Sequence, residues 1–113
     1  MSEVINQDTI AMLKDVLGSG FGEVVDAFLG DTPVRLQKAQ VCAANGDLAG
    51  LEREIHAVKG SSGNVGATLV CQLATAIVDG CRQRSLTAPN EAVIQLIAAF
   101  EQTAPLLDAL KSP

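Results

Sequence analysis

The chain has 113 residues, of which 48% are hydrophobic, and a formal net charge of −5 from 8 Lys and Arg against 13 Asp and Glu. This length fits a single domain spanning residues 1–113, which is large enough to bury a core without disulfides or metals. The acidic charge and the absence of Trp and Tyr disfavour binding to nucleic acids or anionic membranes, which attract cationic and aromatic surfaces. No window resembles a membrane span and no signal pattern opens the chain, so we expect a cytoplasmic protein.

The three cysteines, Cys42, Cys71 and Cys81, are odd in number and irregularly spaced, and the chain holds one histidine. This set provides neither a disulfide framework nor the ligands of a zinc site. We therefore expect buried free thiols, no bound metal and no cofactor.

Apolar residues recur at helical spacing from the first turn of the chain onward. The first helix is expected to open at Asp8 as N-cap and to end at Gly18, because glycine commonly follows a helix. A long second helix begins near Gly20. Pro33 lies within it. Proline either kinks a helix or stands in the first turn of a new one, so we expect a bend around Asp31 to Pro33.

Asn45 to Asp47 predicts the end of the second helix and the N-cap of the third. The fourth helix starts after Gly66 and ends at Arg82 to Arg84, and the fifth starts near Pro89, with Pro105 expected to bend or split it. No segment alternates with period two. The pattern predicts an all-α fold, namely an antiparallel up-down four-helix bundle with an additional short N-terminal helix.

The single histidine lies on the third helix, outside its apolar face. At about 100° per residue, a second stripe faces outward beside that face; it consists of His56, Lys59, Gly60 and Gly63. Glycines inside a helix cost roughly 1 kcal/mol each relative to alanine. Their presence here indicates a place that another molecule must approach closely.

The residues around His56 favour phosphoryl chemistry over hydrolysis. No Ser, Cys or carboxylate is placed by the sequence to form a catalytic triad with it. A neutral imidazole accepts phosphoryl groups near pH 7, and the ammonium of Lys59 lies within reach of an anion on the ring. Two other interpretations remain: His56 is an incidental surface residue, and Lys59 is an ordinary solvated charge.

The run from His56 to Ala67 reads HAVKGSSGNVGA and closely resembles the signature of histidine-containing phosphotransfer (HPt) domains. The stretches from Phe28 to Pro33 and from Ala43 to Leu51 resemble the same family, so the similarity covers most of the chain. The resemblance implies a phosphorelay intermediate. In that role, receiver domains of response regulators, or a hybrid sensor kinase, would be the partners.

By this resemblance His56 is the phosphoryl acceptor, through Nε2, while Lys59 stabilises the phosphate and Gly60 gives the partner access. The possible supporting residues are Ser61, Gly63 and Arg82. The receiver would bring Mg²⁺ and most of the catalytic groups. The chain would then be a monomeric phosphocarrier with no enzyme activity of its own. Ser61 can equally be a packing residue, and Gly63 part of a loop.

One departure from the family pattern concerns the fourth helix. HPt domains often carry Gln or Glu near the histidine, and the corresponding position here is Val78, with Thr75 and Asp79 close by. Two rival functions remain: a non-relaying HPt-like module that sequesters a receiver or kinase, and a purely structural helical adaptor. The extent of the chain favours a stand-alone shuttle, which would dock through the face around His56 and an apolar patch of the first two helices.

Overall fold

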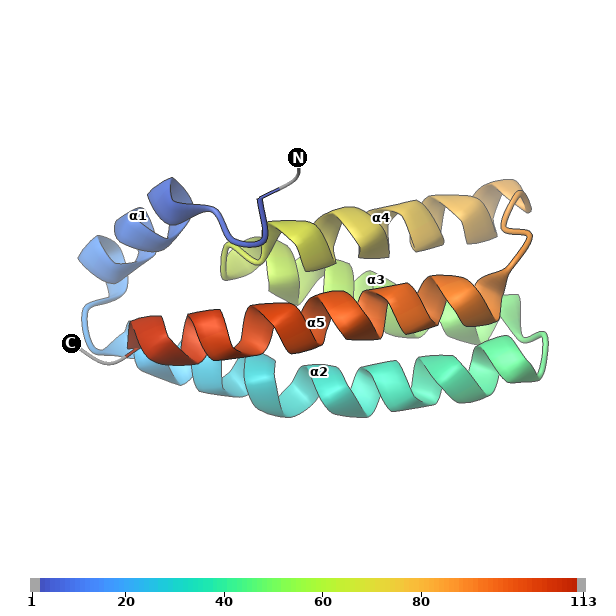
Figure 1. Ribbon diagram of the computed structural model, residues 1–113, viewed down its shortest axis with the longest axis horizontal. Helices are drawn as coiled ribbons and strands as arrows, with labels where there is room; N and C mark the ends of the chain where they lie inside the picture. Colours follow the sequence, from blue (N-terminus) through green and yellow to red (C-terminus); the bar gives the residue numbers. More distant parts are fainter. Residues whose placement is uncertain (1–2, 112–113) are drawn as a thin grey trace.

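The computed structural model describes residues 3–111 and consists of five helices in that range (Figure 1). They are α1 (Gln7–Leu17), α2 (Gly20–Ala44), α3 (Leu48–Asn64), α4 (Thr68–Gln83) and α5 (Pro89–Lys111). Helices α2 to α5 form the bundle: α3 and α5 each pack against both α2 and α4. The short α1 contacts α2 at one end. The prediction of an all-α bundle with a short N-terminal helix is confirmed.

The core runs along the axis of the bundle, where one apolar stripe of each long helix packs against the others. Phe28 of α2 and Phe100 of α5 meet there with ring centroids 5.7 Å apart and planes tilted by 60°, a geometry that aromatic pairs favour. Leu51, Ile55 and Val58 of α3 are completely buried. The α3 stripe is thus fixed in rotation, and this fixes which residues of α3 face outward.

The turn between α2 and α3 follows the prediction. Gly46 has φ +71°, which favours glycine, and Asp47 accepts a hydrogen bond from the backbone N–H of Gly50 at 2.9 Å. The predicted N-cap of α1 was wrong by two residues, because Asn6 caps the helix by accepting from the N–H of Thr9. The N–H of Asn6 itself donates to the carbonyl of Gly66, a tertiary contact that draws the chain into position.

Neither internal proline divides its helix. Pro33 lies inside α2, which is one helix of 25 residues, and Pro105 lies inside the 23-residue α5. A new helix at Pro33 and a split at Pro105, both considered from the sequence, do not occur. The buried residues before and after each proline belong to the same core cluster, so packing holds the two halves in one helix.

Helix α5 meets the length and hydropathy of a membrane span, with a mean hydropathy of 1.2 over its best window. The expectation from the sequence that no window resembles a membrane span is therefore wrong by length and hydropathy. In the fold, however, α5 forms one wall of the bundle and buries Val93, Leu96 and Leu107 completely. Core helices satisfy the same criterion, so the length and hydropathy of α5 do not by themselves indicate a membrane span.

Candidate functional site

The candidate site is the outward stripe of α3. His56 and Gly60 are exposed, as the helical spacing predicts, while Ile55 just before His56 and Val58 between the two are fully buried. Lys59 is half-buried along the α4 side of the same stripe. The imidazole therefore projects from the bundle and does not belong to its core, which is the arrangement that an acceptor side chain requires.

The two glycines of the stripe leave different amounts of room. A Cβ added at Gly60 would meet nothing within 4 Å, so this glycine leaves open space directly beside His56. A Cβ at Gly63 would lie 3.6 Å from Sγ of Cys71, an ordinary contact. Internal packing therefore does not require glycine at position 60.

The backbone under the stripe is hydrogen-bonded by neighbouring side chains. The carbonyl of Lys59 accepts from Oγ of Ser62 at 3.1 Å and from the Sγ–H of Cys71 at 3.6 Å. Oγ of Ser61 donates to the carbonyl of Val58 at 3.3 Å. These contacts agree with a packing role for both serines. Cys71 was not expected at the site, since nothing in the sequence indicates that this residue of α4 lies against α3.

The ammonium of Lys59 forms no ion pair within residues 3–111. Arg35 binds Asp31 at 3.2 Å and Glu54 at 3.1 Å, which leaves it engaged between α2 and α3. Lys59 is consequently available to an incoming anion at His56, one helical turn away.

Helix α4 supplies the other flank of the site. Val78, where the family often has a polar residue, is completely buried and serves the core. Thr75 is half-buried and donates its hydroxyl to the carbonyl of Cys71 at 2.7 Å. Arg82 places Nε 3.1 Å from Oε2 of Glu52, a residue one turn before His56 that the sequence analysis did not single out.

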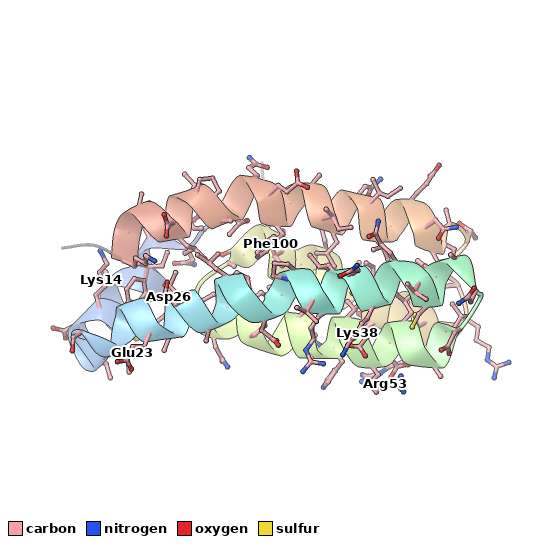
Figure 2. The ribbon with its side chains drawn as sticks, turned by 90° about the horizontal axis from the view of Figure 1, so that it is seen from below. Lys14, Glu23, Asp26, Lys38, Arg53 and Phe100 are labelled. Carbon is pink, nitrogen blue, oxygen red and sulfur yellow. The ribbon has the colours of Figure 1, made fainter. Side chains whose placement is uncertain are left out.

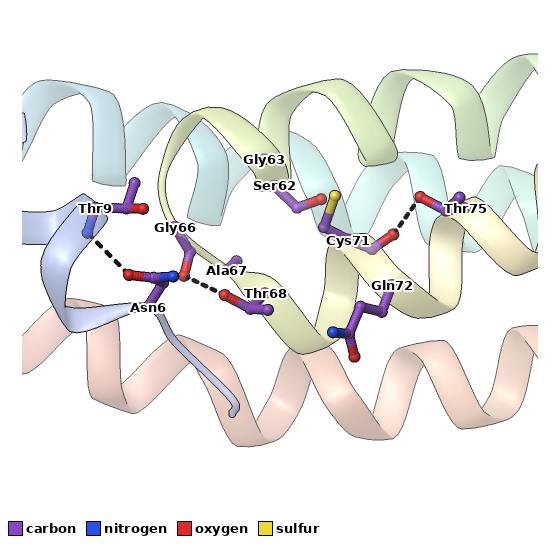
Figure 3. A pocket seen from close by; sticks show the side chains of 10 residues that line it. All are labelled: Asn6, Thr9, Ser62, Gly63, Gly66, Ala67, Thr68, Cys71, Gln72 and Thr75. Atoms are coloured by element: carbon purple, nitrogen blue, oxygen red, sulfur yellow. Dashed lines mark hydrogen bonds between the residues drawn. The ribbon is translucent and has the colours of Figure 1, made fainter. Parts of the chain in front are cut away.

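Two hollows flank the stripe. A pocket of about 350 Å³ between the N-terminal segment and the α3–α4 turn is lined by Gly63, Cys71 and Thr75, among others (Figure 3). On the opposite side, a groove of about 330 Å³ between α2 and α3 is lined by four apolar residues and three polar ones, which are Val24, Ala27, Phe28 and Val65 with Asp31, Ser61 and Asn64. The α2–α3 groove is the more apolar of the two and lies toward the C-terminal end of α3.

Although the chain is acidic overall, basic side chains also project from α2 and α3. Figure 2 shows Lys38 projecting from α2 and Arg53 from α3, while Glu23 and Asp26 project from the other end of α2. Helix α3 itself carries two acidic and two basic residues, Glu52, Glu54, Arg53 and Lys59, so its formal net charge is zero with His56 neutral. Among residues 3–111, no three His, Cys, Asp or Glu side chains gather in a way that could hold a metal ion.

A model of the Hpt domain family matches residues 23–109, and the chain belongs to this family. It is a histidine phosphotransfer protein of the kind that acts in two-component phosphorelays. The histidine-containing phosphotransfer protein B (HptB) of Pseudomonas aeruginosa PAO1 has a similar crystal structure, with a TM-score of 0.89 and 22% sequence identity. The match covers 96% of this chain and 94% of that one. A search of curated protein sequences found no match.

Proposed function

We propose that the protein relays a phosphoryl group between the aspartates of receiver domains, with His56 as its carrier. The observation that carries this proposal is the exposed imidazole beside the open space at Gly60. A receiver must bring a recessed aspartyl phosphate within bonding distance of the ring. A bulky side chain at position 60 would stand in its way.

The transfer step balances without any further reactant. The lone pair of Nε2 of His56 forms a bond to phosphorus as the oxygen–phosphorus bond of the aspartyl phosphate breaks and the carboxylate leaves. A second receiver reverses the step, since its aspartate takes the phosphoryl group and frees the imidazole. Lys59 offsets the charge of the phosphoryl oxygens in both directions.

The receiver would hold Mg²⁺ and align the reacting atoms, so the protein acts as a phosphocarrier with no catalytic cycle of its own. The apolar α2–α3 groove supports docking on this side, and the cations Lys38, Arg53 and Lys59 suit the acidic pocket of a receiver. We propose a monomer in the cytoplasm, with transient contacts to its partners.

The test is incubation with a receiver carrying an aspartyl phosphate, in the presence of Mg²⁺. We expect an acid-labile phosphoryl group on the protein that appears within the lifetime of the phosphoreceiver. His56→Gln should abolish it while the helical circular dichroism and the urea midpoint stay unchanged, because the side chain is exposed.

The control variant is Gln95→Ala, an exposed residue on α5. It should accept the phosphoryl group at the wild-type rate. A protein that binds receivers tightly and never becomes labelled would instead be a sequestering module. Labelling that persists in His56→Gln would overturn the role of the imidazole.

A further inference from the structure

We infer that the Glu52–Arg82 ion pair is a release device for the phosphoryl group: Glu52 competes with phosphorylated His56 for the guanidinium of Arg82. This inference rests on the proposed function and adds Glu52 to it as a positioning residue. It predicts that Glu52 keeps the phosphoryl group on His56 transferable by limiting how firmly the site binds it.

The pair bridges α3 and α4 beside the site. Nε of Arg82 lies 3.1 Å from Oε2 of Glu52, and residues one turn apart on a helix, such as Glu52 and His56, have Cβ atoms about 5–6 Å apart. Arg82 is therefore held by a carboxylate that is itself a neighbour of the imidazole. Lys59 lies one turn after His56 and Glu52 one turn before it, so Arg82 is held toward the start of α3 and Lys59 lies toward its end.

The contact occupies only part of the guanidinium. It uses Nε, and neither Nη atom of Arg82 donates a hydrogen bond within residues 3–111. An arginine has five N–H donors in a planar fork suited to phosphate oxygens. Arg82 can thus begin to bind a phosphoryl group before it leaves Glu52.

The ion pair is weak enough to exchange. The side chains of Arg82 and Glu52 are 51% and 33% exposed, and such pairs contribute little because water screens them. A phosphohistidine brings about two negative charges and three acceptor oxygens, against one charge on the carboxylate. Electrostatics therefore favours movement of Arg82 to the phosphoryl group, while the remaining Glu52 carboxylate repels that group.

Because Arg82 attracts the phosphoryl group and Glu52 repels it, removing the charge of either residue should change the phosphorylated fraction of His56 in opposite directions. Without Arg82, phosphorylated His56 loses one of its two cations, and the phosphorylated fraction at equilibrium should fall about threefold or more. Without the Glu52 charge, Arg82 is released and the repulsion is removed, so the same fraction should rise by a similar factor. This rise in the phosphorylated fraction should be smaller in a variant that also lacks Arg82, because part of the rise comes from the release of Arg82.

The experiment uses phosphoramidate as the phosphodonor, which needs no receiver; its nitrogen–phosphorus bond breaks with release of ammonia as the bond to Nε2 forms. The full chain and the variants Glu52→Gln, Arg82→Gln and the double variant are brought to equilibrium, and phosphohistidine is quantified by ³¹P NMR. The Nε–H resonance of Arg82 is followed by ¹⁵N NMR in the same samples. Glu101→Gln on α5 and Lys14→Gln on α1, both exposed and outside the α3–α4 interface, reproduce the charge changes as controls.

We expect the Arg82 resonance to shift on phosphorylation and the two single variants to change the phosphorylated fraction in opposite directions. A phosphorylated protein with an unmoved Arg82 resonance, or an Arg82→Gln variant with the same phosphorylated fraction as Lys14→Gln, would overturn the exchange and leave the carrier function standing. If phosphoramidate and phosphorylated receivers both fail to label His56, the proposed function fails as well.

Discussion

Arg35 of α2 reaches across the helix interface and places Nη1 3.1 Å from Oε1 of Glu54 on α3, whose side chain is only 10% exposed. The same arginine binds Asp31 one turn earlier in α2 at 3.2 Å. Hydrogen bonds to Asp31 and then to Glu54 raise the pKa of Arg35 above its ordinary value. The pair is thus the polar link between the two helices that flank the proposed docking groove.

Replacing Arg35 by methionine should destabilise the fold by about 1–3 kcal/mol, because it leaves the carboxylate of Glu54 buried without its main partner. The measurement is the free energy of unfolding from urea titration. Asp31→Asn removes only the exposed partner and should cost less than about 0.5 kcal/mol. Equal costs for the two variants would contradict the assignment of Glu54 as the residue that needs the arginine.

Gly60→Ala should stabilise the protein and slow phosphotransfer at the same time. The added Cβ meets nothing within 4 Å, and alanine is favoured over glycine inside a helix by roughly 1 kcal/mol. The same methyl group narrows the approach to His56, and Gly60→Gln should reduce the transfer rate about tenfold or more.

Gly30→Ala is the matched control for that experiment, since Gly30 lies in α2 and also has nothing within 4 Å of an added Cβ. It should raise the unfolding free energy by a similar amount and leave the transfer rate unchanged. Unaltered transfer in Gly60→Gln, measured with a phosphorylated receiver, would refute the role of Gly60 in access.

Gly50→Ala should destabilise the protein by about 1–3 kcal/mol, in contrast to Gly60→Ala. An added Cβ at Gly50 would collide with the carboxylate of Asp47 and lie 2.8 Å from Sγ of Cys42. The collision disturbs the N-cap of α3, which Asp47 forms through the N–H of Gly50. Thermal unfolding followed by circular dichroism measures the loss; the control Gly22→Ala, whose nearest neighbour would be 3.8 Å away, should fold normally.

Cys42 and Cys81 should react slowly with iodoacetamide at pH 8. Burial raises the pKa of both thiols, and the nearby carboxylates of Asp47 and Glu52 respectively raise it further. A raised pKa lowers the fraction of reactive thiolate at pH 8, so alkylation should keep accelerating above the ordinary thiol pKa of about 8.5. Peptide mass spectrometry would give the rates; labelling of Cys81 as fast in the folded protein as in urea would contradict this.

The raised pKa of the Cys81 thiol also makes the unfolding free energy depend on pH. A thiol whose pKa is raised by folding contributes its full stability below the unfolded pKa of about 8.5, and this contribution declines as the pH rises through the folded value. Cys81→Ala should therefore flatten the fall in unfolding free energy between about pH 8 and 10. Urea titrations at several pH values test this.

Local signals in the sequence predicted most of the helix boundaries. Gly46 and Asp47 mark the α2–α3 turn because a positive φ favours glycine and an aspartate caps the following helix, and both effects involve neighbouring residues alone. The N-cap of α1 escaped prediction because Asn6 is positioned by the carbonyl of Gly66, 60 residues later. A new helix at Pro33 and a split at Pro105 do not occur because core packing on both sides of each proline outweighs a local break.

The sequence by itself determined the all-α fold and the outward stripe of His56, Lys59 and Gly60, because helical periodicity sets which side of a helix is apolar. Only the tertiary structure decided which residues of α4 meet that stripe. It buried Val78, placed Cys71 under Lys59 and joined Arg82 to Glu52, since the rotation and register of two packed helices depend on the fit of the whole core.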